Sequence, residues 1–464
     1  MFKKVTPEDI KTFINMCGEK SVFTGDTIRD DYTHDEMMEY GAFCPEVVIE
    51  CKTTEEISKV LKYCNDEMIP VTPRGSGTGL CGGAVALYGG VLLSTNKMNK
   101  ILEIDKNTLT GVIEPGVLLL EFSSVVNENG LLYAPDPGEK SASIGGNVMT
   151  NAGGMRAVKY GVTRDYVKGM EVVLADGTVM ELGGKIAKNS SGYSLKDLLI
   201  GSEGTLAIVT KIYLKLLPKP KKMISLLIPF NDFKSCMDMV PIIMNLPNIP
   251  TTLEFMEKAV LEDSREYLGK SFPNNEYPAY LIVSYSGNHK KEIEDFYADC
   301  AQICLEHGAV DVFISDTEER QDAVWSARGA FLEAIKSSTP EMDECDVVVD
   351  IDKVYDFLQF VNELSVQYNI RIRSFGHAGD GNLHIYVCKD NFPDDEWQVI
   401  VKACMDAMYE KAKEMKGQVS GEHGIGHAKK EYLRQSLDET QIALMKGIKQ
   451  VFDPRGILNP GKIL

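Results

Sequence analysis

The sequence predicts an α+β protein with two or three domains, and three observations support this fold class. The chain has 464 residues, whereas a single domain usually has about 100–200. Hydrophobic residues make up 44% and charged residues 25%, as in folded soluble proteins and unlike disordered chains or coiled coils. Segments with the alternation of strands are interleaved with segments that have the periodicity of amphipathic helices.

The first domain is expected to begin with a small α/β unit. Residues 1–42 carry two helical patterns. Residues 47–51 predict a strand, Thr53 or Thr54 predicts the N-cap of a helix, and residues 69–72 predict a second strand. The elements expected after it are short strands at 91–94, 101–104 and 111–114, a helix at 118–127, and strands around 169–174 and 204–217 with a hairpin turn at 175–177.

The composition changes at LPKPKK, near residue 218, where a second α+β domain is expected. Its strands are predicted by ISLLIPF, AYLIVSYSG, VDVFIS and DVVVDI, and its long helices by residues 290–308 and 352–368. A further helix at 438–452 precedes an extended tail, ILNPGKIL. We therefore expect domains at 1–217 and 218–420, followed by a carboxy-terminal segment at 421–464.

Charge and hydropathy exclude several classes of partner. The net charge is −19, which argues against nucleic acid. The densest basic stretch, KLLPKPKK, is short and interrupted by prolines, and it is assigned no function. The amino terminus lacks the apolar segment of a signal peptide, and no run of about 18 apolar residues occurs. We expect the protein to stay in the cytoplasm.

The cysteines argue for a reducing compartment. There are 11 of them, an odd number, and they are scattered without a CxxC motif. Such a distribution is typical of reduced, buried side chains. It also leaves no ligand set for an iron–sulfur cluster, so any relay of single electrons is expected to be another subunit.

Three glycine-rich loops indicate a large anionic ligand. PRGSGTGLCGG follows a predicted strand, as needed where backbone N–H groups approach a pyrophosphate. It contains GxGxxG, but no helix follows, so a nicotinamide-binding unit is not expected. A tight loop without a ligand remains the alternative for this segment. The second loop, PDPGEKSASIGGNVMTNAGGMRAVKYGVTRD, adds hydroxyl and amide groups, and the third, GSEGTLAIVT, precedes a strand.

These motifs resemble the flavin-linked 2-hydroxy-acid dehydrogenases of the vanillyl-alcohol-oxidase superfamily. PRGSGTGL, PDPGEKSASIGGNVMTNAGG and GSEGTLAIVT resemble the FAD-binding half of that family, and FGHAGDGNLH, SGEHGIG and FDPRGILNPGK resemble its carboxy-terminal half. The resemblance spans nearly the whole chain. It implies a two-part FAD-binding domain, an α+β substrate (cap) domain, and a final segment that returns to the FAD domain.

The resemblance also implies the cofactor residues. Because positions 74–82 contain no histidine, to which covalent flavin is usually attached in this family, we expect non-covalent FAD. The residues implied for it are Arg74, Gly75, Ser76, Gly77, Thr78, Gly79, Pro135, Asp136, Gly138, Ser141, Ser143, Gly146, Asn147, Thr150, Gly153, Gly161, Glu203, Gly204, Ile208 and Asn459.

Four of the seven histidines fall within a short part of the chain, and three of the side chains there suit a metal ion. His377 closes a predicted strand and His384 opens the next, so their imidazoles can face one point. With Glu422 they form a two-histidine, one-carboxylate set suited to zinc, iron or manganese. The resemblance implies the same three ligands. Either histidine taken alone would more often be structural.

Oxidation of a 2-hydroxy acid requires loss of the hydroxyl proton and transfer of a hydride to the flavin. A divalent ion stabilises the alkoxide, and His423 is the candidate base because it adjoins Glu422 and imidazole titrates near neutral pH. His427 is expected to support a neighbouring site residue or to be structural. The family's Trp-x-x-Arg pattern implies Arg328 for the substrate carboxylate; an arginine on a helix surface is the alternative.

The expected function is therefore FAD- and metal-dependent oxidation of a small D-2-hydroxy acid. No second cation for a distal carboxylate is evident near Cys345 and Asp346, which favours D-lactate, with glycolate and D-2-hydroxyglutarate as alternatives. A non-catalytic flavin-binding subunit is a further alternative, although it would be expected to lose the histidines. The resemblance implies that electrons pass to an electron-transferring flavoprotein or an iron–sulfur subunit.

Overall fold

The computed structural model describes residues 2–270 and 276–464, and the chain forms two compact units. Unit 1 comprises Met1–Gly153, Val162–Lys219 and Glu422–Leu464, and unit 2 comprises Gly154–Gly161 and Pro220–Gly421. The short segment 154–161, expected in the first domain, groups with unit 2 instead. The physical reason is local, because the Lys159 ammonium donates to Thr251 and to Ser286.

Unit 1 begins with a four-stranded sheet in the order β1-β2-β4-β3. Its members are β1 (Val22–Thr24), β2 (Val47–Glu50), β3 (Val71–Arg74) and β4 (Val91–Ser94), of which β2, β4 and β3 are parallel. The helices are α1 (Pro7–Cys17) and α2 (Thr54–Glu67). Thr53 is the N-cap of α2, where its hydroxyl accepts from the Glu56 N–H. The prediction of a second helix within residues 1–42 is wrong, because the chain forms 3₁₀ turns after α1.

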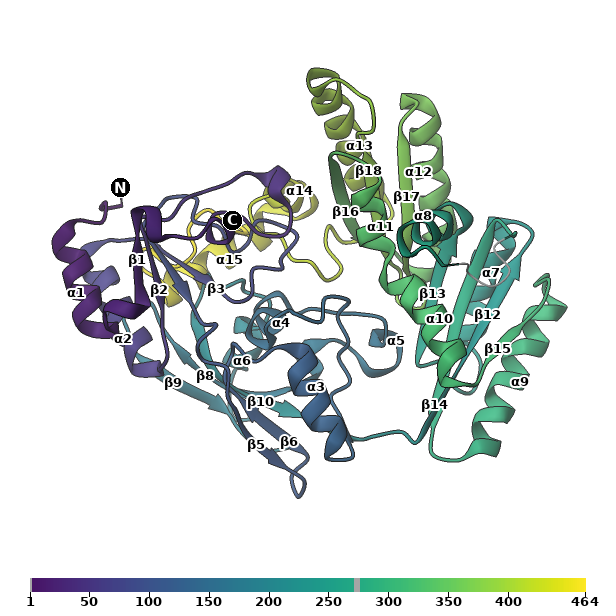
Figure 1. Ribbon diagram of the computed structural model, residues 1–464, viewed down its shortest axis with the longest axis horizontal. Helices are drawn as coiled ribbons and strands as arrows, with labels where there is room; N and C mark the ends of the chain where they lie inside the picture. Colours follow the sequence, from purple (N-terminus) through teal and green to yellow (C-terminus); the bar gives the residue numbers. More distant parts are fainter. Residues whose placement is uncertain (1, 271–275) are drawn as a thin grey trace. The chain divides into compact units, whose positions relative to one another are not determined.

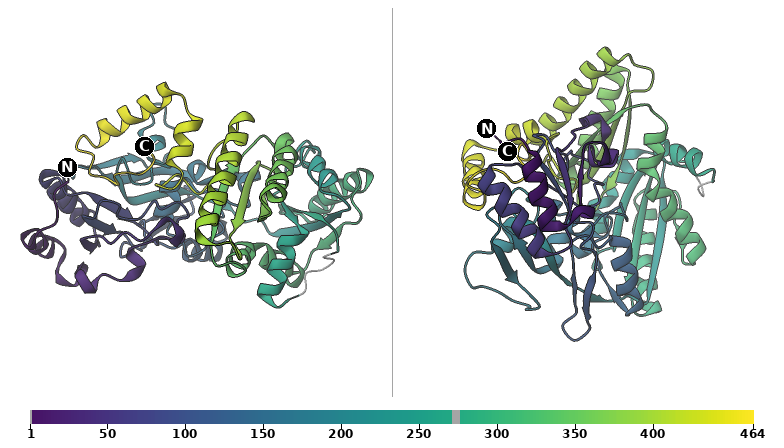
Figure 2. Two further views of the ribbon diagram at one scale, coloured as in Figure 1. Left: turned by 90° about the horizontal axis from the view of Figure 1, so that it is seen from above. Right: turned by 60° about the vertical axis from the view of Figure 1, so that its left-hand side comes forward.

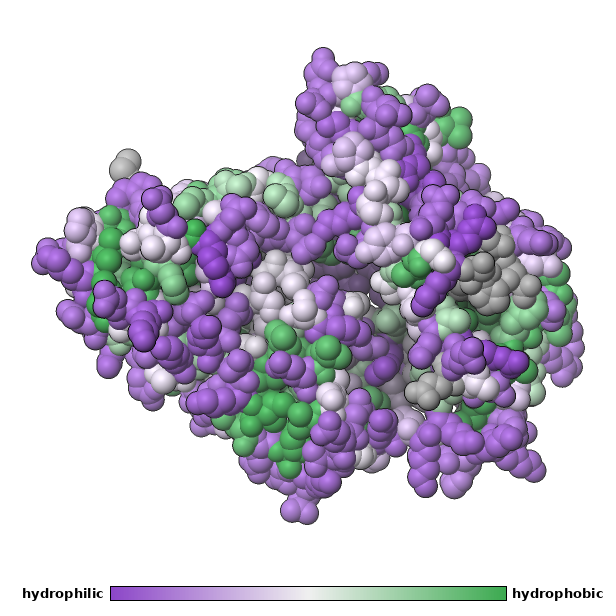
Figure 3. Space-filling view, in the orientation of Figure 1, coloured by the Kyte–Doolittle hydropathy of each residue, from purple (hydrophilic) through white to green (hydrophobic). Residues whose placement is uncertain are grey.

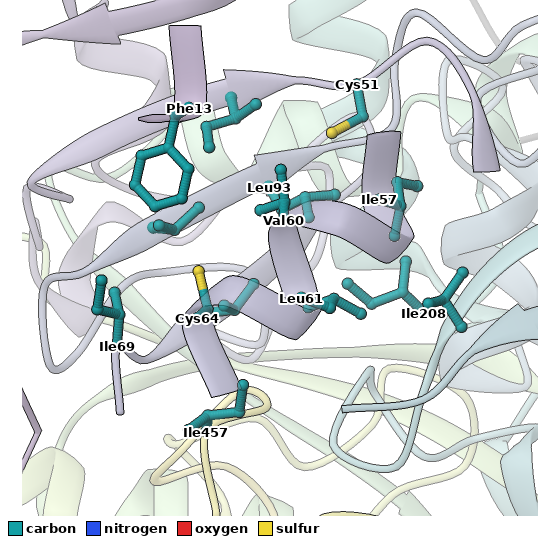
Figure 4. Close-up of a cluster of buried hydrophobic side chains, with 14 of the residues drawn as sticks. Phe13, Cys51, Ile57, Val60, Leu61, Cys64, Ile69, Leu93, Ile208 and Ile457 are labelled. Carbon is teal, nitrogen blue, oxygen red and sulfur yellow. The ribbon is translucent and has the colours of Figure 1, made fainter. Parts of the chain in front are cut away.

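The core of unit 1 joins distant parts of the sequence. Ile57, Val60 and Leu61 of α2 pack with Leu93 of the sheet, and Ile457 from the tail joins them (Figure 4). All of these side chains are fully buried. The tail therefore completes a core whose members in α2 lie nearly four hundred residues earlier in the chain.

A second, antiparallel sheet of unit 1 has the order β5-β6-β10-β8-β9. Its strands are β5 (Ile101–Asp105), β6 (Thr110–Ile113), β8 (Val167–Val173), β9 (Val179–Gly183) and β10 (Ile208–Lys215), and β7 (Leu131–Leu132) pairs with β11 (Leu217–Pro218). The remaining helices of unit 1 are α3 (Leu119–Glu128), α4 (Ile144–Thr150), α6 (Leu195–Leu199), α14 (Lys430–Ser436) and α15 (Glu439–Phe452). Figure 2 shows both chain termini on this unit.

Unit 2 is built on a seven-stranded sheet in the order β15-β12-β14-β13-β17-β18-β16, antiparallel throughout (Figure 1). The strands are β12 (Lys222–Phe230), β13 (Thr252–Glu257), β14 (Ala279–Gly287), β15 (Phe313–Ser315), β16 (Met342–Val348), β17 (Arg371–His377) and β18 (Asn382–Cys388). Its helices are α5 (Ala157–Tyr160), α7 (Phe233–Met244), α8 (Lys258–Leu268), α9 (Lys290–Glu306), α10 (Glu318–Gly329), α11 (Phe331–Ser337), α12 (Val354–Tyr368) and α13 (Asp394–Glu414).

The two faces of this sheet differ in chemistry. Helices α7, α9, α12 and α13 pack on one face, where Phe255 meets Phe233 of α7. Helices α8, α10 and α11 pack on the other, where Phe375 meets Phe331 of α11. Because side chains alternate along a strand, the second face also receives Glu254 and His377, and it is polar at its centre.

The surface agrees with the strongly acidic composition. Figure 3 shows a mainly hydrophilic face, with apolar residues in separate patches. Among the described residues, no helix combines the length and the hydropathy needed to cross a membrane.

Candidate functional site

The first glycine loop follows the carboxyl end of β3 and is supported by Arg74. The Arg74 guanidinium is buried and donates to the carbonyl groups of Asp31, His34 and Ala84. It passes beneath Gly77, where φ is +80° and a Cβ would collide with the guanidinium. Arg74 therefore ties the segment around Asp31 and His34, and the residue Ala84, to the end of β3, and the role of the Gly75 to Gly79 backbone in binding a ligand stays a prediction.

The residues of this loop fit a pyrophosphate-bearing cofactor. Among the described residues, the N–H groups of Gly77 and Thr78 have no recorded protein acceptor. Nearby, the Ser143 hydroxyl caps α4 and accepts from the Ser76 N–H. The amide nitrogen of Asn147, a residue that is 5% exposed, has no hydrogen-bond partner in the described part of the chain. Because Asn147 is buried, its unpaired amide nitrogen indicates a missing acceptor.

The structure places the other residues predicted for FAD as follows. Pro135, Asp136, Gly138 and Ser141 lie in the irregular segment after β7, and Gly146, Asn147 and Thr150 lie in α4. Gly153 ends the first segment of unit 1, whereas Gly161 belongs to unit 2. The side chain of Ile208 packs in the hydrophobic core of unit 1 with Ile57 and Leu61, and a contact of this residue with FAD stays a prediction.

Glu203 and Asn459 hold loops of unit 1 together. The buried Glu203 carboxylate accepts from the N–H groups of Ile425 and Gly426, and its backbone has φ of +51° next to Gly204. Burial raises the pKa of Glu203, and these two hydrogen bonds oppose the rise. The Asn459 amide donates to the carbonyls of Gly83 and Glu203. Their side chains therefore position the loops, and a direct contact of either with FAD stays a prediction.

Sequence reasoning missed two buried charges beneath these loops. The Asp35 carboxylate accepts from the N–H groups of Met37 and Gly82, and burial raises its pKa to about 6. The Lys462 ammonium donates to the Val85 carbonyl, and burial lowers its pKa to about 7. Neither residue has a sequence motif that separates it from the many exposed acids and lysines, so no signal could have found them.

The two predicted histidine ligands lie on one face of unit 2. In the β17–β18 pair, Phe375 is opposite His384 and His377 is opposite Asn382, so His377 and His384 are diagonal neighbours. Their Nε2 atoms are 3.4 Å apart, and both side chains are buried. Two nitrogen ligands about 2.1 Å from a tetrahedral ion lie about 3.4 Å from each other. The histidine pair therefore fits a divalent metal.

A buried carboxylate lies on the Nδ1 side of each imidazole, and the sequence did not indicate these two carboxylates. His377 Nδ1 donates to Glu254 Oε1 over 2.7 Å, and His384 Nδ1 lies 3.8 Å from Asp346 Oδ1. Glu254 and Asp346 are both fully buried. A carboxylate on the far nitrogen of a histidine is the usual support of a metal ligand.

Arg328 was predicted either to contact the substrate or to lie on a helix surface, and it does not lie on the surface. It is 7% exposed, and its Nε and Nη2 both donate to Glu254 Oε2, over 2.9 and 2.7 Å. The guanidinium lies over the rings of Phe331 and Phe375. The arginine is thus fixed on the same face as His377.

Glu422 and His423 follow a segment that unit 2 holds in place. Asp346 Oδ2 accepts from the Ser420 hydroxyl and from the Gly421 N–H. Glu422, the next residue, begins the last segment of unit 1, where its carboxylate lies against Gly153 and His423 Nε2 is 3.7 Å from Glu422 Oε1. Their placement against the two histidines of unit 2 stays a prediction.

His427 has the structural surroundings that were expected. Its ring packs edge-on against Tyr40 and Phe43, and a Cβ at Gly82 would collide with it. Burial, together with the charges of Lys462 and Lys430, lowers the pKa of His427 to about 4. The imidazole is therefore neutral at ordinary pH and serves packing.

Two family models match the chain. The model described as "FAD binding domain" matches residues 45–183, and the model described as "FAD linked oxidases, C-terminal domain" matches residues 219–463. The second match covers more than half of the chain and includes every strand of unit 2.

Similar proteins span the whole chain. A D-lactate dehydrogenase of Anaerostipes hadrus is 50% identical, over 100% of this chain and 98% of that protein. Glycolate oxidase subunit GlcD of Bacillus subtilis is 38% identical, over 99% and 97%. Among solved structures, p-cresol methylhydroxylase with substrate bound superposes with a TM-score of 0.83 at 20% identity, over 100% of this chain and 98% of that one. That likeness confirms the predicted two-part FAD-binding fold with its α+β second domain.

Proposed function

The chain belongs to the FAD-linked oxidase family, and from this premise we propose that it is an FAD- and metal-dependent dehydrogenase that oxidises D-lactate to pyruvate. The observation that carries the proposal is the buried histidine pair, whose Nε2 atoms lie at the separation of two ligands on one ion. The relative named for this reaction is 50% identical over its full length.

His377, His384 and Glu422 would hold the metal, and the glycine loops of unit 1 would hold FAD. When bound, the metal lowers the pKa of a coordinated hydroxyl group, and FAD accepts a hydride. The ligand set of two imidazoles and one carboxylate suits zinc, iron or manganese. Because the donors are buried, water is excluded from the His377 and His384 side of such a site.

Arg328 and His423 would supply the remaining groups. Glu254 engages the Nε and Nη2 of Arg328, which leaves the Nη1 amino group to receive a substrate carboxylate. The imidazole of His423 would take the hydroxyl proton as the hydride leaves the adjacent carbon. The product is then a 2-oxo acid.

The charges of unit 2 favour a monocarboxylate. Arg371 and Arg373 lie further along β17, but Arg371 pairs with Asp390 and Arg373 with Asp263. Neither arginine is therefore an unpaired cation for a second carboxylate. Glycolate remains a candidate because it is smaller than lactate, whereas D-2-hydroxyglutarate would require a second cation, and Arg371 and Arg373 are both already paired.

The test is an anaerobic titration of the FAD-loaded protein with D-lactate, L-lactate, glycolate and D-2-hydroxyglutarate in parallel, followed by flavin absorbance. Elemental analysis of the same sample gives the metal content. We expect D-lactate to bleach the flavin fastest, with about one metal ion per chain. Faster bleaching by another acid would replace D-lactate as the substrate, and flavin that no acid bleaches in metal-replete protein would favour the non-catalytic alternative.

The role of His423 is tested by His423→Ala. We expect this variant to keep its FAD and metal and to lose flavin reduction by D-lactate, because no base is left to accept the proton. His427→Phe is the control, since that ring serves packing. Undiminished flavin reduction in His423→Ala would contradict the assignment.

We also propose that the electrons pass to a separate protein. Among the described residues, all the free cysteines except Cys44 are buried, and they are spread over the whole chain, so a cluster of this chain is not expected to relay them. An electron-transferring flavoprotein or an iron–sulfur subunit would then accelerate reoxidation of the reduced flavin over oxygen alone. If neither does, the partner proposal is abandoned.

A further inference from the structure

Glu254 is a fully buried carboxylate at the centre of the sheet of unit 2, and its two oxygens serve different groups. Oε1 accepts from His377 Nδ1 over 2.7 Å. Oε2 accepts from both Nε and Nη2 of Arg328. The exposed fractions are 0% for Glu254, 6% for His377 and 7% for Arg328, so water does not compete for these hydrogen bonds.

The strand register explains why one residue reaches both partners. Phe255 of β13 is opposite Gly376 of β17, so Glu254 is opposite His377 on the same face. Arg328 comes from α10, which covers that face. The face therefore brings a predicted metal ligand and a predicted substrate contact to the same carboxylate.

The geometry around Glu254 fixes the tautomer of His377. Glu254 Oε2 accepts two N–H groups of the Arg328 guanidinium, which pairs with a carboxylate in its ionised form. An ionised carboxylate can only accept a hydrogen bond, so His377 carries its proton on Nδ1 and presents the lone pair of Nε2. That is the tautomer that binds a metal through Nε2.

The same carboxylate fixes the plane of the guanidinium. With Nε and Nη2 both directed to one oxygen, and with Phe375 below at 4.7 Å from the ring centroid to Cζ, the Arg328 group cannot rotate freely. Its Nη1 edge keeps one direction, as recognition of a planar carboxylate requires.

We propose that Glu254 is a positioning residue that sets two groups at once, the Nε2 lone pair of His377 for the metal and the Nη1 edge of Arg328 for the substrate carboxylate. The proposal rests on the proposed function, because it takes His377 as a metal ligand and Arg328 as the carboxylate contact. Its consequence is that the loss of one carboxylate, which touches neither metal nor substrate, weakens the binding of both.

The part of the proposal that concerns His377 and the metal, here called the metal limb, is tested by a matched pair of FAD-loaded variants, Arg328→Met and Glu254→Gln/Arg328→Met. Both lack the arginine, so neither buries a cation without a partner, which would otherwise endanger folding. The affinity for Zn²⁺ and Mn²⁺ is measured by titration with elemental analysis. We expect the double variant to bind metal about 10- to 100-fold more weakly than Arg328→Met. Loss of a residue that hydrogen-bonds a metal ligand commonly has an effect of this size. Equal affinities would overturn this limb.

The part of the proposal that concerns Arg328 and the substrate carboxylate, here called the substrate limb, is tested with Glu254→Asp and Glu254→Gln in the metal-replete enzyme. We expect both to raise KM for D-lactate more than they lower kcat, with Glu254→Asp closer to the wild type because it keeps the charge. The control is Glu257→Gln, a residue of the same strand on the opposite face of the sheet, which should leave KM unchanged. A wild-type KM in Glu254→Gln, or a change in kcat alone, would overturn this limb.

The outcomes separate this proposal from the proposed function. Metal affinity and FAD content are measured without substrate, so a chain that oxidises another 2-hydroxy acid still tests the metal limb. If the wild type binds no metal, the proposed function fails first and the positioning role of Glu254 toward His377 falls with it.

Discussion

Buried carboxylates set the chemistry of unit 2 at the scale of single residues. Glu254, Glu344 and Asp346 are all fully buried on the polar face of its sheet. Each has a partner: Glu254 has His377 and Arg328, Glu344 accepts from the Tyr386 hydroxyl, and Asp346 accepts from the Asn382 amide. Such groups are stable inside a protein only when their hydrogen bonds are made, so this face is built for a purpose other than packing.

The titration of Glu257 gives a prediction at this scale. Burial raises the pKa of Glu257 from 4.5 to about 7, against the attraction of Arg373. Because the folded state holds this proton more tightly than the unfolded state, the stability that Glu257 contributes is present below pH 4.5 and is lost as the pH rises to about 7.

Thermal unfolding of the wild type and Glu257→Gln between pH 4.5 and 8 measures this effect. The amide cannot ionise, so we expect the variant to gain stability relative to the wild type as the pH rises to about 7, with a constant difference above it. A difference that does not change with pH would show that Glu257 titrates at its ordinary pKa.

At the scale of elements, the hairpin of β17 and β18 is the unit that pairs the histidines. Its turn contains Gly381, with φ of +76°, and a Cβ there would collide with the Val349 carbonyl. The Gly381 carbonyl also accepts from the Val349 N–H. The turn is therefore fixed on both sides, and it sets the separation of His377 and His384.

Gly381→Ala should displace this turn. We expect its metal content to fall while its FAD content stays near that of the wild type, because the glycine loops belong to unit 1. The matched control is Gly269→Ala, which also has a positive φ, +62°, but nothing within 4 Å of the added Cβ. Elemental analysis and flavin absorbance of the purified proteins measure both quantities, and equal metal content in the two variants would contradict the role of the turn.

At the scale of the whole molecule, unit 1 is assembled from both ends of the chain. The Val71 N–H of β3 donates to the Ile457 carbonyl, and the Val71 carbonyl accepts from the Asn459 N–H. Lys449 of α15 donates to the carbonyls of Thr205 and Leu458. The loop after Gly421 is held by Glu203. The loops of unit 1 that are predicted to bind FAD are therefore held by residues that follow unit 2 in the sequence.

Ile457→Ala tests this dependence. Ile457 is fully buried, and we expect its truncation to cost roughly 2–5 kcal/mol of unfolding free energy and to weaken FAD binding, since Asn459 and Lys462 follow it in the tail. Val451→Ala is the control, because Val451 is 78% exposed. Denaturant unfolding and FAD titration measure the two effects. Equal stability of the two variants would mean that the tail is not part of the core.

The sequence by itself determined most of the elements, the family, and the motifs from which the FAD and metal residues are predicted. The N-cap of α2, the strand β4, the glycine loops and the histidine hairpin follow from local patterns, because caps, turns and periodicity depend on neighbours in the chain. The FAD-binding fold followed from motifs whose residues lie close together in sequence. The error at residues 1–42 arose because each 3₁₀ turn there has only 3 residues, too few to show a periodic pattern.

Only the tertiary structure decided which of these residues support others. Contacts between distant parts of the chain decide three findings. Arg74 and Glu203 hold loops, Ile208 packs in the core, and Arg328 is paired with Glu254. Glu254, Asp346, Asp35 and Lys462 carry no motif, and their importance comes from burial. Burial turns an ordinary carboxylate or ammonium into a group that must be paired, and burial is a property of the folded chain.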